Sequence, residues 1–198
     1  MSGREQEITI REACIEDVPG ILRIYNEVVA SSTAIYIDDP VTLENREAWL
    51  REQQKRGYPV LVADQGSGEI AGFCSLSDWR GAWPGYRFTV EHSVHVGADC
   101  RGMGIGRRLV EAIFPYALAL GKHVMIGAID ASNDASLKFH GRLGFREVAH
   151  FREVGFKFGR WLDLVFMQRI VDARAQSPQA DGQPPARPLT VTAIFTDG

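Results

Sequence analysis

The 198-residue sequence lacks the features that define several protein classes. It contains only three cysteines, Cys14, Cys74 and Cys100, which are too few for a disulfide framework and do not have metal-ligand spacing. Its longest apolar runs fall short of the roughly 20 residues that cross a bilayer. The opening segment, MSGREQEITI, has no apolar signal core. We therefore expect a soluble, cytoplasmic protein with no bound metal and no membrane attachment.

The chain also lacks a basic excess. Its 22 Lys and Arg residues against 25 Asp and Glu residues give a formal net charge of −3. A general nucleic-acid binder normally carries positive charge, so we do not expect a nucleic acid as partner. The length, with 45% hydrophobic and 24% charged residues, is typical of one globular domain.

Proline is concentrated near the C-terminus. Four of the nine prolines lie in QSPQADGQPPARP, residues 176–188, a composition typical of a linker or a flexible tail. The β-prone run LTVTAIF follows; it could pair with a sheet edge or a partner chain, but an untethered terminus is the more common case. We predict a folded domain over residues 6–172 and a flexible tail over 173–198.

Strand-like and helix-like segments alternate through the predicted domain. Residues 7–12 alternate apolar and polar side chains, which predicts a strand, and helical spacing follows Asp17. Thr42 is the predicted N-cap of a second helix that ends at Gly57. Further strands are predicted at 59–63, 70–76, 88–96, 123–129, 145–149 and 162–169, and further helices at 105–120 and 133–143. The order β-α-α-β-β-β-α-β-α-β-β predicts an α+β fold with helices on both faces of a mixed sheet.

A glycine-rich turn precedes the helix predicted at 105–120. It reads CRGMGIGRR over residues 100–108. Backbone N–H groups at a helix start bind phosphate oxygens, and glycine lets the main chain approach the ligand closely. Arg101, Arg107 and Arg108 add positive charge there. The spacing fits neither a dinucleotide fingerprint nor a P-loop, so the residues alone allow a phosphate site or a plain structural turn.

Two motifs together carry a family resemblance. The R-x-x-G-x-G pattern at residues 101–106 resembles the acyl-CoA loop of the GCN5-related N-acetyltransferases. Asn133, His140 and the sequence LGF at 143–145 resemble the second signature of that family. The resemblance implies the family fold, with a mixed, mostly antiparallel central sheet, and acetyl-CoA as cosubstrate. The implied cofactor-binding residues are Val94, His95, Val96, Arg101, Gly102, Met103, Gly104, Ile105, Gly106, Arg107, Asn133 and Arg142.

A narrower resemblance covers roughly residues 8–170. The segments DWR at 78–80, TVEHSVHV at 89–96 and KFGRWLD at 157–163 resemble the phosphinothricin and methionine sulfoximine N-acetyltransferase branch. This resemblance implies acetylation of the α-amino group of small amino-acid analogues such as methionine sulfoximine, methionine sulfone and phosphinothricin. It also implies a homodimer. The cysteines need have no catalytic part, because direct attack in a ternary complex needs no acyl-enzyme.

Within this interpretation Glu91 is the expected general base. Partial burial in a strand would raise its pKa toward the working pH, although a Glu on a solvent-facing strand position is the ordinary alternative. Backbone N–H groups of 94–96 could stabilise the oxyanion if a bulge leaves them unpaired, with the His95 side chain facing solvent. His140 is either the acid that protonates the thiolate or a structural histidine. Asn133 could be a plain N-cap, a ligand of the CoA arm, or both.

The acceptor site should recognise a carboxylate and a small side chain. A guanidinium fork suits a carboxylate, which makes Arg80 the first choice, with Tyr86 and Arg87 as further candidates. The implied substrate-binding residues are Tyr36, Trp79, Arg80, Gly81, Ala82, Glu91, His92 and Ser93. A peptide N-terminal acetyltransferase and a non-catalytic acyl-CoA sensor are the alternatives.

Overall fold

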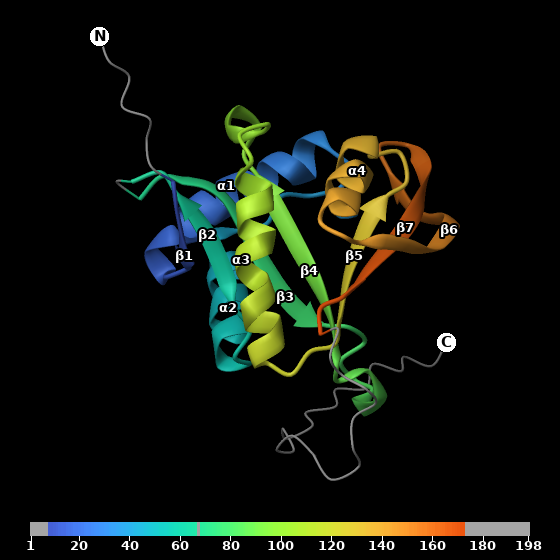
Figure 1. The fold of residues 1–198 in the computed structure, drawn as a ribbon. Helices are drawn as coiled ribbons and strands as arrows, with labels where there is room; N and C mark the ends of the chain where they lie inside the picture. Colours follow the sequence, from blue (N-terminus) through green and yellow to red (C-terminus); the bar gives the residue numbers. More distant parts are fainter. Residues whose placement is uncertain (1–7, 67, 173–198) are drawn as a thin grey trace, which may run out of the picture.

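The computed structural model of the chain describes residues 8–66 and 68–172 (Figure 1). Its elements are β1 (Thr9–Glu12), α1 (Val18–Ser31), α2 (Leu43–Lys55), β2 (Val60–Asp64), β3 (Ile70–Asp78), β4 (Thr89–Val96), α3 (Ile105–Ala119), β5 (Val124–Asp130), α4 (Asp134–Arg142), β6 (Arg146–Lys157) and β7 (Arg160–Ile170). Short 3-10 helices occupy Ile15–Asp17, Pro84–Tyr86 and Ala98–Cys100. This order confirms the α+β arrangement expected from the sequence. The predicted tail lies outside the described residues, and the boundary at 172 stays a prediction.

The strands form one seven-stranded sheet in the order β1-β2-β3-β4-β5-β7-β6. Neighbouring strands are antiparallel except for β4 and β5, which are parallel. The sheet is therefore mixed and mostly antiparallel, as expected. The parallel pair lies at its centre, where the glycine-rich turn leaves β4 for α3.

Helices cover both faces of this sheet (Figure 1). Successive side chains of a strand point to opposite faces, so Val60 and Val62 of β2 pack in the cluster with α1 and α2. Leu61 and Ala63 pack in the cluster with α3. Thr42 caps α2 as predicted, because its Oγ1 accepts a hydrogen bond from the Asn45 amide at 3.3 Å. None of the helices in the described residues is long and apolar enough to cross a membrane.

Strand β6 is longer than the strand predicted at 145–149. It continues to Lys157, with irregular pairing to β7 between Phe151 and Gly155. Glu153 has φ 54° there, which places the irregularity in the left-handed region. The sequence pattern did not reveal this extension because β6 is an edge strand with few buried positions, so it has no clean alternation.

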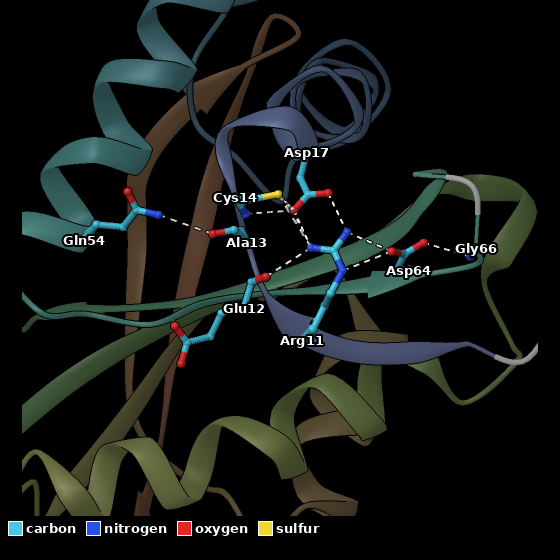
Figure 2. Close-up of polar contacts among 8 residues, drawn as sticks. All are labelled: Arg11, Glu12, Ala13, Cys14, Asp17, Gln54, Asp64 and Gly66. Atoms are coloured by element: carbon cyan, nitrogen blue, oxygen red, sulfur yellow. Dashed lines mark hydrogen bonds and ion pairs between the residues drawn. The ribbon is translucent and has the colours of Figure 1, made fainter.

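A partly buried ion pair ties the first strand to the start of α1 (Figure 2). Arg11 donates two hydrogen bonds to the Asp17 carboxylate, at 2.6 and 2.7 Å, and another two to Asp64 of β2, at 3.0 and 2.8 Å. The Cys14 amide also donates to Asp17, at 2.8 Å. Burial by itself would raise the pKa of Asp17, but the hydrogen bonds from Arg11 and Cys14 outweigh it and hold that pKa below its usual range.

The Asp17→Asn variant should be less stable at neutral pH. Hydrogen bonds to charged groups contribute about 1.5–3 kcal/mol, so we expect the free energy of unfolding to fall by about 2–3 kcal/mol. A carboxylate with a depressed pKa stabilises the fold above its unfolded pKa, and this stability is lost as the pH falls through the folded pKa. The difference from wild type should therefore shrink below about pH 4 in urea titrations. An equal difference at all pH values would contradict this account, and the exposed Asp99→Asn is the control.

Candidate active site

The centre of the sheet opens where β4 and β5 separate. Their parallel pairing covers only Thr89↔Val124, Val90↔Met125 and Glu91↔Ile126. Both strands continue past these pairs, and Figure 1 shows them diverging toward their C-terminal ends. The β3–β4 register meanwhile runs without a shift to Gly72↔Val96. The edge of β4 therefore opens without a bulge in the β3–β4 pairing, because the parallel pair diverges.

The divergence frees backbone groups of β4. The Gly97 amide donates to Ala71 of β3 at 2.9 Å. Because backbone N–H groups alternate in direction along a strand, the His95 amide also points to β3. The Val94 and Val96 amides then point to the opening. Of the three amides proposed for the oxyanion, the geometry supports these two and not His95.

A cavity of about 500 Å³ lies between the end of β4, the glycine-rich turn and α4. Gly102 and Gly104 have φ angles of 79° and 76°, and a Cβ at either would meet nothing within 4 Å. The first amides of α3 precede its first internal hydrogen bond, from the Arg108 amide to Gly104 at 3.1 Å. A left-handed glycine turn with free helix amides suits a pyrophosphate, so this cavity fits the CoA group that the motif implies.

The three arginines of the turn have different hydrogen-bond partners. Arg101 lines the cavity, yet its guanidinium donates to Glu27 of α1 at 2.9 Å and to the Val96 carbonyl at 3.1 Å. Arg108 donates to the Ile8 carbonyl at 2.5 Å. The exposed Arg107 pairs with Glu111 at 2.8 Å, so two of the three arginines, Arg101 and Arg107, have a carboxylate partner. The positive charge expected at this turn is thus partly balanced by neighbouring carboxylates, and Arg101 and Arg108 also tie the turn to α1 and to Ile8.

Most of the expected cofactor residues surround this cavity. They are Val94, Val96, Arg101, Gly102, Gly104, Ile105, Gly106, Arg107 and Arg142. His95, Met103 and Asn133 do not line it. The cavity is also lined by residues that were not among the predicted cofactor-binding residues: Cys100, Ala135, Ser136, Phe139 and Leu143. Helical spacing of positions 135, 139 and 142 on one face of α4 was the available signal.

Asn133 caps α4 through one of its two side-chain polar groups. Its Oδ1 accepts from the Ser136 amide at 3.0 Å, as in an ordinary N-cap. The side-chain NH₂ group is a separate donor, so the cap and a contact with the CoA arm are compatible.

Glu91 occupies the last paired position before the strands separate. Its side chain is half-buried, and burial raises the pKa of the carboxyl. Strand alternation places the Glu91 side chain on the face of the sheet that α1 and α2 cover, together with Ile126 of β5. This position lies beside the opening and suits a base that must accept a proton near neutral pH.

His92 and His140 lie on the opposite face and pack together. Their rings are 5.1 Å apart, and His92 is 5% exposed. The expected place of His92 in the same cleft as Glu91 is therefore wrong, because neighbouring strand residues face opposite ways. Ser93, by contrast, shares the Glu91 face. Burial, aided by the nearby His140 and His95, lowers the pKa of His92 to about 3, so its imidazole stays neutral.

The contacts of His140 define its tautomer. Its Nδ1 lies 2.8 Å from the Ser136 carbonyl, which can only accept, so Nδ1 carries the proton and Nε2 a lone pair. Burial lowers the pKa of His140, although the Ser136 contact opposes this. A neutral ring of this tautomer has no proton to give at Nε2. This geometry favours the structural alternative over the acid.

The His95 side chain is also placed differently from the expectation. It is half-buried rather than facing solvent, with its ring 5.2 Å from Phe73 and 6.3 Å from Tyr25. Burial, with the neighbouring Arg46, lowers the pKa of His95 to about 4. His95 therefore packs between β4 and α1 as a neutral aromatic side chain.

The Glu91 face continues across β5 and β7 as a half-buried apolar surface. Trp79, which follows β3, packs edge-on against Phe166 of β7, with ring centroids 5.1 Å apart. Residues 80–87 form an exposed connection that contains Arg80, Gly81 and Ala82. Arg80 has φ 48°, and its guanidinium lies 5.4 Å from the Tyr86 ring. Trp79 thus belongs to the wall of the site, whereas Arg80 lies at its solvent edge.

Tyr36 approaches the same surface from the connection between α1 and α2. Its hydroxyl donates to the Asp163 carbonyl at 3.2 Å, and its ring lies against Gly155 of β6. Burial, followed by the nearby carboxylates of Asp130 and Asp163, raises the pKa of Tyr36 to about 12. The phenol therefore stays protonated and acts as a hydrogen-bond donor.

A buried lysine fixes this connection. Lys157 is 1% exposed, and its ammonium donates to the carbonyls of Val29, Ser32 and Ile35 at 2.7, 2.9 and 2.8 Å. Burial lowers its pKa, with Asp38 opposing this. The first residue of the KFGRWLD segment thus ties the end of α1 to the β6–β7 hairpin and holds Tyr36 in place.

Replacing this lysine should loosen the connection locally. In Lys157→Met three carbonyls lose a charged donor, so we expect faster amide hydrogen exchange across 32–37 and an unfolding free energy lower by about 2–3 kcal/mol. The exposed Lys55→Met on α2 is the control. Unchanged exchange at 32–37 in Lys157→Met would show that the ammonium does not hold this segment.

Comparisons with known proteins place these features among enzymes. The acetyltransferase (GNAT) family model matches residues 21–145. An L-methionine sulfoximine/L-methionine sulfone acetyltransferase of Pseudomonas aeruginosa is 48% identical over 170 residues, covering 86% of this chain and 98% of the relative. An L-amino acid N-acyltransferase of Escherichia coli is 45% identical over 175 residues, covering 88% and 100%.

A solved structure of an acetyltransferase has a similar fold. It is a GNAT-superfamily phosphinothricin acetyltransferase from Sinorhizobium meliloti in complex with acetyl-CoA. It superposes with a TM-score of 0.82 at 33% identity and covers 89% of this chain and 96% of its own. Residues 8–66 and 68–172 contain no group of three or more His, Cys, Asp or Glu side chains that could hold a metal ion, and Cys14, Cys74 and Cys100 are free.

Proposed function

The chain belongs to the acetyltransferase (GNAT) family, and we propose that it transfers the acetyl group of acetyl-CoA to the α-amino group of small amino-acid analogues. The acceptors that we propose are methionine sulfoximine, methionine sulfone and phosphinothricin. One observation supports this most strongly: a half-buried carboxylate, Glu91, lies where β4 and β5 part beside a glycine-turn cavity that suits CoA. The named relatives support the choice of acceptor.

The cofactor cavity supplies binding and charge stabilisation. The amides at the start of α3 and the turn at 101–107 would hold the pyrophosphate, with Arg142 on the opposite wall. The Val94 and Val96 amides face the opening of the sheet, so they can stabilise negative charge that develops on the thioester carbonyl oxygen. Asn133 can donate its NH₂ group to the CoA arm.

Glu91 would act as the general base in a direct transfer. An α-ammonium group is mostly protonated at neutral pH and must lose a proton before it can attack. Glu91 takes that proton, and the neutral amine attacks the thioester carbonyl to give a tetrahedral intermediate. The C–S bond then breaks, and the second proton that leaves the nitrogen as the amide forms is passed to the departing CoA thiolate. The raised pKa of Glu91 makes it a better proton acceptor near pH 7. His140 stays neutral and supports the cavity wall next to Ser136.

The acceptor would bind on the Glu91 face of the sheet. Trp79 would form an apolar wall for the substrate side chain, and Tyr36 would form a second wall that carries a hydrogen-bond donor. Arg80, at the solvent edge, is the proposed partner of the substrate carboxylate. Gly81 and Ala82 adjoin Arg80, and Ser93 shares the face with Glu91. Arg80→Ala should then raise the KM for the amino acid more than that for acetyl-CoA, and equal effects would make Arg80 a structural residue.

Product analysis tests this proposal. Incubation with acetyl-CoA and methionine sulfone should give the Nα-acetylated product by mass spectrometry. Intact-mass analysis of the protein with acetyl-CoA alone should show no added acetyl group, because transfer is direct. A stoichiometric acetyl-protein species that disappears when methionine sulfone is added would contradict direct attack.

We also propose a homodimer formed through the β6–β7 hairpin. This hairpin exposes large apolar side chains that water solvates poorly, among them Phe156 and Trp161, whose rings lie 5.1 Å apart, and Val154 and Phe158. In the sheet that residues 8–66 and 68–172 form, β6 is also an edge strand. Light scattering after gel filtration should give twice the chain mass, and Trp161→Glu should shift it toward one chain. A single-chain mass for wild type at micromolar concentration would refute the dimer.

A further inference from the structure

A second groove adjoins the cofactor cavity at the C-terminal end of α4. Its volume is about 710 Å³, and Arg142 and Leu143 line both spaces. The groove runs from there between α3 and the start of β6. Its remaining lining residues are Glu111, Gly144, Arg146, Val148, Gln168, Arg169 and Ile170. The two spaces therefore adjoin at Arg142 and Leu143.

This groove is positively charged in a chain whose formal net charge is −3. Three guanidinium groups, of Arg142, Arg146 and Arg169, line it against one carboxylate. That carboxylate, of Glu111, already accepts a hydrogen bond from Arg107 at 2.8 Å. The groove thus offers an excess of N–H donors to an anion, and guanidinium groups bind phosphate oxygens in a bidentate manner.

The three arginines differ in mobility. Arg169 is held in place: its guanidinium donates to the Leu143 carbonyl and lies 4.1 Å from the Phe114 ring. Arg142, in the last turn of α4, and Arg146, the first residue of β6, are exposed. The groove therefore combines one fixed cation with two cations that can adjust to a ligand.

We infer that this groove binds the ribose 3′-phosphate of the CoA cosubstrate, with Arg142 and Arg146 as its direct ligands. The inference rests on the proposed function, which assigns the pyrophosphate to the turn at 101–107. In CoA only the ribose lies between the pyrophosphate and the 3′-phosphate. The two phosphate groups can therefore occupy adjoining spaces such as these two, which share Arg142 as a lining residue. A phosphomonoester carries up to two charges, which suits a site with two adjustable arginines and a third nearby.

Binding of CoA and of 3′-dephospho-CoA, measured by titration calorimetry, tests this inference. Wild type should bind CoA more tightly than 3′-dephospho-CoA by about 10-fold or more, because charge-assisted phosphate contacts are lost. Arg146→Gln, and more strongly Arg142→Gln combined with Arg146→Gln, should weaken CoA binding by about 10-fold or more and leave 3′-dephospho-CoA within about 2-fold. Arg51→Gln, on α2 and paired only with Glu47 across one helix turn, removes the same charge elsewhere and should change neither.

The outcomes separate this inference from the proposed function. Equal weakening of both nucleotides would place these arginines on the pyrophosphate and overturn the inference while leaving the cofactor cavity in use. Unchanged CoA binding in the double variant would overturn it as well. Failure of the wild-type protein to bind either nucleotide would instead contradict the proposed function.

Discussion

The Glu91→Gln variant should lose most of its turnover while it still binds acetyl-CoA. General-base groups contribute about 10²- to 10⁴-fold, and the amide of Gln cannot take the proton of the acceptor ammonium, so we expect kcat to fall by that factor. The side-chain shape is retained, and Glu91 is not among the residues that line the cofactor cavity. The Kd for CoA should therefore stay within about 2-fold of wild type.

The pH profile gives this prediction a second readout. Glu91 must be ionised to act, and burial raises its pKa. Activity should therefore decline as the pH falls through a value above the ordinary glutamate pKa of about 4.3. Glu91→Gln should remove this acid limb, whereas the exposed Glu52→Gln on α2 should keep both the limb and the rate. Unchanged kcat in Glu91→Gln would exclude Glu91 from the mechanism.

The Gly155→Ala variant should impair acceptor binding without affecting the cofactor. A Cβ at Gly155 would lie 2.3 and 2.5 Å from two carbon atoms of the Tyr36 ring, so the ring must move away from the β6–β7 hairpin. Overpacking of this kind costs about 1–3 kcal/mol. If displacement of Tyr36 weakens binding of the acceptor by the same free energy, the KM for the amino acid should rise by about 5- to 100-fold.

A second glycine gives a matched control. A Cβ at Gly141, on α4, would meet nothing within 4 Å, so Gly141→Ala should leave both KM values unchanged and slightly favour the helix. The KM for acetyl-CoA should also stay unchanged in Gly155→Ala. A Gly155→Ala enzyme with wild-type KM for every amino acid would show that Tyr36 does not border the acceptor.

The sequence predicted the order of the elements because each carries a strong local signal. Alternating strands, the Thr42 cap and the glycines after the helices depend only on nearby residues. The glycine turn was found for the same reason: its conformation needs glycine at positions 102 and 104, where φ is positive.

Tertiary partners could not be predicted in this way. The pairing of Arg101 with Glu27 joins residues 74 positions apart, so the turn looked more cationic than it is. The three carbonyls that hold the Lys157 ammonium are likewise more than 120 positions away in the chain. The His92 error was avoidable, because strict alternation along a strand places His92 and Glu91 on opposite faces.

Release of free CoA thiol from acetyl-CoA shows whether the protein acetylates amino-acid analogues. The acceptors to compare are methionine sulfoximine, methionine sulfone, phosphinothricin, the standard amino acids and a short peptide. We expect rapid release with at least one of the sulfur or phosphorus analogues and little with the peptide. Release with the peptide alone, or none with any acceptor while CoA still binds, would contradict the account.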